Sequence, residues 1–114
     1  MSEPIDFEKL SFGLIVKVSE AKNFAFEALN LAKKNKKKEA ETKLGQARKA
    51  IGEAGHMHMD VVSKEAQGED IKFSVLFMHA EDQLLTVQTL IDIFNEMIEQ
   101  QYEINNLKKL INKK

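Results

Sequence analysis

The sequence contains no cysteine, no tryptophan and only one proline among its 114 residues. Without cysteine, the chain can form neither a disulfide framework nor a thiolate zinc site, and it has no thiol nucleophile. No apolar run approaches the roughly 20 residues that a membrane-spanning helix requires, and the acidic N-terminus lacks the apolar segment of a secretory signal. We therefore expect a cytoplasmic protein with one domain, residues 1–114, that begins with a short arm at about residues 1–8.

Neither sign of charge dominates, because 17 Lys and Arg residues stand against 18 Asp and Glu residues. The overall charge consequently gives no reason to expect binding to nucleic acid. The lysine-rich stretch 33–38 is a local exception. Because no aromatic side chains alternate with its lysines, a solvated turn between two helices is favoured over a binding patch.

Apolar residues recur at intervals of three and four along three stretches, 9–34, 37–67 and 73–111. This period places side chains on one side of a helix, and no stretch shows the alternation of a strand. Asn35 and Gly68 are suited to end the first two helices, because both residues tolerate the left-handed conformation. Ser74 is suited to cap the third helix. The pattern predicts an all-α fold, an up-down-up three-helix bundle.

The third predicted helix carries two apolar seams that are offset by one residue. Together they make an apolar face wider than one pair of neighbouring helices needs, so a second set of neighbours is expected. The simplest arrangement packs one seam inside the bundle and the other against further copies of the chain. A central helix in a larger monomeric core is the alternative. The first seam comprises Phe77, Ala80, Leu84, Val87, Ile91, Phe94 and Ile98; the second comprises Leu76, His79, Gln83, Thr86, Leu90, Ile93, Met97, Gln100, Ile104, Leu107 and Ile111.

His79 is the main candidate for chemistry among the three histidines. It lies in the opening turns of the third predicted helix, where the helix dipole favours a phosphate or another anion. An imidazole there can act as a base, a nucleophile or a ligand. Asp82, three residues further on, can orient the ring or hold a cation. The competing interpretation is a histidine that is merely hydrogen-bonded within the second seam.

A second, weaker candidate is the pair Glu53 and His56, which has the Glu-x-x-His spacing of di-iron carboxylate bundles. Such sites need two copies of this motif and two further glutamates, and the sequence has no second copy. A metal-dependent bundle enzyme therefore remains a minor alternative.

The segment Met78-His79-Ala80-Glu81-Asp82-Gln83-Leu84, preceded by Glu65-Ala66-Gln67-Gly68-Glu69, resembles a known family. It is similar to the IIA (EIIA) component of the lactose/cellobiose, or N,N'-diacetylchitobiose, branch of the bacterial phosphotransferase system. The resemblance covers about residues 10–110 and implies a three-helix bundle that assembles into a homotrimer.

In terms of chemistry, the resemblance implies that His79 is a transient phosphohistidine. It would receive phosphate from the histidine carrier protein HPr and pass it to a cysteine of the EIIB component, which serves the membrane component EIIC. Asp82 matches an aspartate whose three copies share a magnesium-like cation on the trimer axis, an arrangement that relieves their repulsion. The sugar would be a β-disaccharide such as cellobiose or lactose.

Three positions depart from the family pattern. Glu81 stands where glutamine is usual, Gln83 where histidine is usual, and His58 where relatives tend to have glutamine. Gln83 can still hydrogen-bond the ring or the phosphate but cannot carry a positive charge. His58 is expected to make a polar contact with the third helix, which would replace the polar contacts of the usual histidine at position 83. These departures leave a second function open, a trimeric helical adapter that retains the bundle without phosphoryl transfer.

Overall fold

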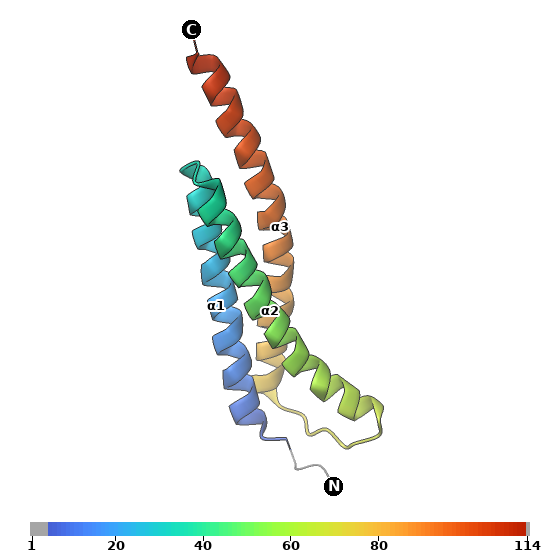
Figure 1. The fold of residues 1–114 in the computed structure, drawn as a ribbon. Helices are drawn as coiled ribbons and strands as arrows, with labels where there is room; N and C mark the ends of the chain where they lie inside the picture. The colour runs from blue at the N-terminus through green and yellow to red at the C-terminus, as the bar shows by residue number, and fades with distance from the viewer. Residues whose placement is uncertain (1–4, 114) are drawn as a thin grey trace.

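The computed structural model describes residues 5–113 and shows three helices in up-down-up order, as the sequence predicts. Helix α1 spans Phe7–Lys33, α2 spans Lys37–Ala66 and α3 spans Val75–Asn112. They form a rod of 71 × 22 × 20 Å, in which the C-terminal part of α3 projects beyond the turn between α1 and α2 (Figure 1). Pro4 and the beginning of the expected arm lie outside the described residues.

The helix boundaries follow from local chemistry. Helix α1 begins two residues earlier than expected, because the Asp6 carboxylate accepts a hydrogen bond from the Lys9 backbone N–H at 3.1 Å. The expected arm of about residues 1–8 is therefore too long by Phe7 and Glu8, which are helical. Asn35 has φ 60° and Gly68 has φ 94°, so both adopt the left-handed conformation expected after α1 and α2.

The core is built from small residues on α1 and α2 and larger ones on α3. Alanines let the backbones of α1 and α2 approach closely, while all seven residues of the first predicted seam on α3 are buried. The buried alanines are Ala21, Ala25, Ala28 and Ala32 on α1 and Ala40, Ala47, Ala50 and Ala54 on α2. This outcome confirms the assignment of the first seam to the interior of the single chain.

A buried asparagine joins α3 to the end of α1. The Asn105 side chain donates a hydrogen bond of 2.9 Å to the backbone carbonyl of Ala32, and Gln101 donates one of 3.0 Å to Asn105. The carbonyls in the last turn of a helix have no partner within that helix. The Ala32 carbonyl also accepts a hydrogen bond of 3.0 Å from the Asn35 backbone N–H. Asn105 therefore adds a second donor from far away in the sequence, which ties α3 to the end of α1.

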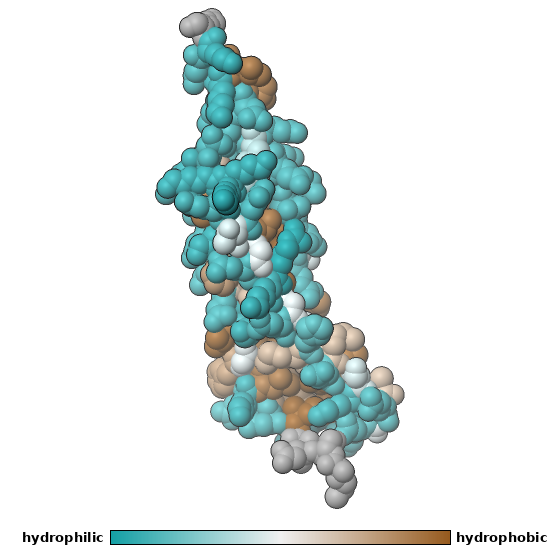
Figure 2. Space-filling view, in the orientation of Figure 1, coloured by the Kyte–Doolittle hydropathy of each residue, from teal (hydrophilic) through white to brown (hydrophobic). Residues whose placement is uncertain are grey.

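At the opposite end of the rod, the C-terminal part of α2 diverges from α1 and α3 (Figure 1). Apolar surface gathers toward this end of the visible face, whereas the rest of that face is mainly hydrophilic (Figure 2). An eight-residue connection, 67–74, then leads from α2 to α3. It brings the start of α3, with His79, to the same end as the start of α1.

Candidate functional site

His79 is the fifth residue of α3, and its side chain is exposed. The N-terminus of α3 is capped by Ser74, whose hydroxyl accepts a hydrogen bond from the Phe77 N–H at 3.2 Å. This confirms Ser74 as the cap of α3. Within residues 5–113, the His79 ring has no hydrogen bond or ion pair to another residue. Its nitrogens are therefore accessible to a reagent or a partner.

The two residues expected to assist His79, Asp82 and Gln83, follow it within about one turn of α3. Asp82 is exposed and Gln83 is partly buried. In the described part of the chain, neither is hydrogen-bonded to the imidazole. Their expected roles, cation binding for Asp82 and hydrogen bonding for Gln83, remain predictions.

Glu81 points toward α2 and meets His58 there. The distance from His58 Nδ1 to Glu81 Oε2 is 2.9 Å, and the two side chains are 19% and 30% exposed. The His58 ring also stacks on Phe77, with ring centroids 6.4 Å apart. The expected contact of His58 with the third helix is confirmed, and its partner there is Glu81. The sequence singles out His58 and Glu81 individually as departures from the family pattern. It gives no sign that they form a pair, because 23 positions separate them.

The alternative metal motif is not assembled. The Glu53 carboxylate lies 2.8 Å from the Lys17 ammonium group on α1, and this hydrogen-bonded contact lowers the pKa of Glu53 and raises that of Lys17. His56 is exposed on α2. Among the described residues, no group of three potential metal ligands occurs. Glu53 thus has a charged partner on α1.

The second predicted seam stays largely exposed in the single chain. Ile93 is 51% exposed, Met97 39%, Ile104 44% and Leu107 57%. These residues repeat on one side of α3 with a spacing of three and four, which is the spacing of coiled-coil interfaces. A row of exposed apolar side chains of this kind marks an interaction surface.

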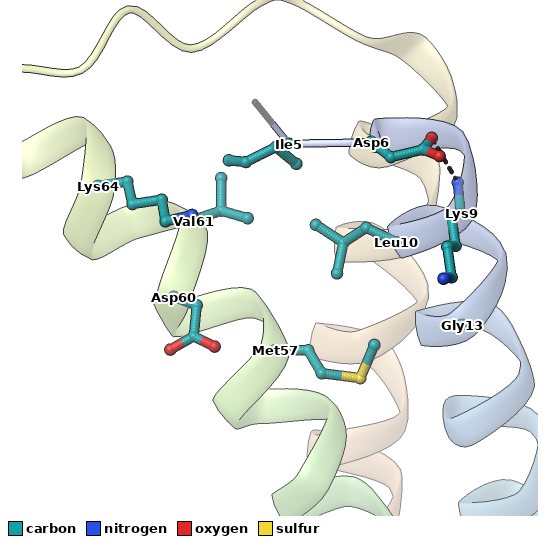
Figure 3. Close-up of a pocket in the computed structure, with 9 residues that line it drawn as sticks. All are labelled: Ile5, Asp6, Lys9, Leu10, Gly13, Met57, Asp60, Val61 and Lys64. Carbon is teal, nitrogen blue, oxygen red and sulfur yellow. Dashed lines mark hydrogen bonds between the residues drawn. The ribbon is translucent and has the colours of Figure 1, made fainter. Parts of the chain in front are cut away.

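A groove of about 560 Å³ lies near the same end, between the start of α1 and the end of α2 (Figure 3). Ile5, Leu10, Met57 and Val61 provide apolar surface, and charged side chains such as Lys64 lie around it. Its nine lining residues do not include His79, Asp82 or Gln83. The groove therefore adds nothing to the chemistry at the start of α3. None of the helices in the described residues combines the length and apolarity needed to cross a membrane.

Comparisons with known proteins agree with the fold and with the expected family. Residues 9–102 match the family model described as "PTS system, Lactose/Cellobiose specific IIA subunit". The chain is 33% identical over 92 residues to the oligo-β-mannoside-specific EIIA component of Bacillus subtilis, covering 81% of this chain and 84% of that protein.

Two solved structures extend the comparison. The cellobiose-specific enzyme IIA of Bacillus anthracis superimposes with a TM-score of 0.84 at 34% identity, covering 91% of this chain and 95% of that one. A IIA(chitobiose) solved in complex with HPr superimposes with a TM-score of 0.79 at 24% identity, covering 90% and 99% of the two chains. The latter likeness concerns the fold alone.

Proposed function

This chain belongs to the lactose/cellobiose-specific IIA family of the phosphotransferase system, and we propose that it is a cytoplasmic phosphocarrier with His79 as the phosphorylated residue. The observation that carries the proposal is an exposed imidazole without an intramolecular partner among the described residues, held at the start of a capped helix in a IIA chain. Phosphate would come from phospho-HPr and go to a cysteine of EIIB. A β-disaccharide such as cellobiose or lactose would then be taken up through EIIC.

The transfer needs little chemistry from the protein beyond positioning. A ring nitrogen of His79 attacks the phosphorus, a new N–P bond forms, and the N–P bond to the donor histidine of HPr breaks. In the next step, the EIIB thiolate attacks the same phosphorus and His79 leaves. Such transfers depend mainly on an aligned nucleophile and on stabilisation of the phosphoryl oxygens. Gln83, one turn after His79, is the side chain of this chain that we assign to hydrogen-bond the ring or the phosphoryl group.

We further propose that the protein is a homotrimer assembled through the second seam. The exposure of Ile93, Met97 and Ile104 in the single chain supports this assignment. Partners such as HPr and EIIB would then dock around His79 at one end of the assembly.

Asp82 fits a shared magnesium ion in this trimer. Carboxylate oxygens are ligands that Mg²⁺ prefers, and Asp82 lies on the same side of α3 as Thr86 and Ile93, because these follow it by about one and about three helical turns. Within the described residues, one chain by itself offers no group of three ligands. The cation would therefore be held by Asp82 from three copies, where it would offset their mutual repulsion.

The test is intact-mass analysis after incubation with phosphoenolpyruvate, enzyme I and HPr. The wild type should gain one acid-labile phosphoryl group per chain, and His79→Ala should gain none. His56→Ala is the matched control, because His56 is also an exposed histidine and should leave phosphorylation unchanged. If the wild type accepts no phosphate from active upstream proteins, the adapter function replaces the proposal.

A further inference from the structure

The contact between His58 and Glu81 joins two helices directly beside the proposed phosphorylation site. His58 Nδ1 and Glu81 Oε2 lie 2.9 Å apart, although the geometry is not that of an aligned hydrogen bond. Nδ1 is buried and has no other polar partner in the described part of the chain. A buried polar nitrogen without any partner is unfavourable. The carboxylate is thus the group that compensates it.

Aromatic packing holds His58 in this position. Its ring lies nearly parallel to that of Phe77, at an interplanar angle of 22°, and Phe77 packs edge-on against Phe7 with ring centroids 5.3 Å apart. The three rings come from α2, α3 and α1 respectively. Because Phe77 is also buried, the His58 ring has little freedom to leave Glu81.

Glu81 is close enough to His79 for its charge to matter. The two residues are two positions apart, so their side chains leave α3 on nearly opposite sides and their ends are separated by about 10 Å, the width of a helix. Over this distance at a protein surface, an unpaired carboxylate repels a doubly charged phosphoryl group enough to change a rate several-fold at low salt. Asp82 is a second carboxylate in the same turn.

We propose that His58 is a positioning residue that holds the Glu81 carboxylate against α2, on the side of α3 away from His79, which keeps the start of α3 accessible to an incoming phosphoryl group. This inference rests on the proposed function, because it concerns transfer to His79. The two acidic residues of the site then have separate partners. Glu81 contacts His58 within its own chain, and Asp82 would bind the cation shared between chains.

A double-mutant cycle tests the pairing. Initial rates of phosphorylation by phospho-HPr are measured at about 10 mM and about 500 mM salt, which span weak and strong screening, for the wild type, His58→Gln, Glu81→Gln and the double variant. Glutamine is polar and close in size to histidine, but it has no aromatic ring to stack on Phe77. At the low salt concentration, His58→Gln should be slower by about three- to five-fold, and adding Glu81→Gln should restore the wild-type rate. At the high salt concentration the deficit should fall below about two-fold, because the repulsion is screened.

His56→Gln is the matched control, since His56 is an exposed histidine on the same helix, and its rate should equal that of the wild type. Circular dichroism establishes that each variant is folded. An unchanged rate in His58→Gln, a deficit that Glu81→Gln does not restore, or a deficit that does not depend on salt would each overturn the inference. Failure of the wild type itself to accept phosphate would instead refute the proposed function.

Discussion

Replacing Ile93 by glutamate should separate the copies of the chain without unfolding the single chain. Full burial of an isoleucine side chain contributes about 1.5–3 kcal/mol, and Ile93 is still 51% exposed in one chain. Covering the exposed half would contribute about 1 kcal/mol per chain, or about 3 kcal/mol for three chains. Its loss alone would raise the trimer dissociation constant by about 100-fold, and three adjacent glutamates would repel one another in addition.

Leu85→Glu is the matched control for this prediction. Leu85 is 57% exposed, similar to Ile93, but it lies outside the second seam and lines a depression with Met59 of α2. Sedimentation velocity over a range of micromolar concentrations should show the wild type and Leu85→Glu at three times the 13.0 kDa mass of the chain. Ile93→Glu should sediment as a folded monomer. A trimeric Ile93→Glu variant, or equal dissociation of both variants, would refute the assignment of the interface.

The remaining predictions concern the cation, the core and acid stability. Chelation with EDTA should lower the thermal midpoint of the wild type but not that of Asp82→Asn, and equal midpoints with and without EDTA would argue against a shared cation. In urea unfolding, Asn105→Ala should lose about 0.5–1.5 kcal/mol, because the buried side-chain hydrogen bond to the Ala32 carbonyl is lost, whereas the exposed neighbour Asn106 should tolerate alanine. Because the hydrogen bond from Lys17 lowers the pKa of Glu53, the pair stabilises the fold at neutral pH and this contribution is lost on acidification below about pH 4.5. The stability difference between wild type and Lys17→Gln should therefore shrink as the pH falls below about 4.5, and a difference that does not change with pH would count against the pair.

Much of the fold could be predicted because its signals are local. The period of apolar residues identified three helices, and Asn35, Gly68 and Ser74 identified three of their boundaries from the conformations and hydrogen bonds that these residue types favour. The start of α1 lies two residues before its expected position, because Asp6 caps the helix ahead of the first residues of the apolar pattern. The family motif likewise identified His79 from a contiguous segment.

The candidate site was only partly predictable, for a physical reason. His79, Asp82 and Gln83 share one helix, and the sequence places them by helical geometry alone. The pairs His58 with Glu81 and Lys17 with Glu53 join different helices, and the sequence does not specify which residues of two packed helices lie at the same height. Gly13 illustrates this point: its missing side chain leaves space that the Met57 methyl group of α2 approaches closely.

By itself, the sequence determined three helices, the approximate positions of their ends and the presence of two apolar seams on the third. Each of these depends on residues within a few positions of one another, so each follows from helix periodicity and capping. Only the tertiary structure decided that the first seam is buried and the second exposed, that Asn105 binds the end of α1, and that Glu81 meets His58. Those outcomes depend on how the helices pack, because residues far apart in the sequence become neighbours only when their axial positions and rotations are fixed together.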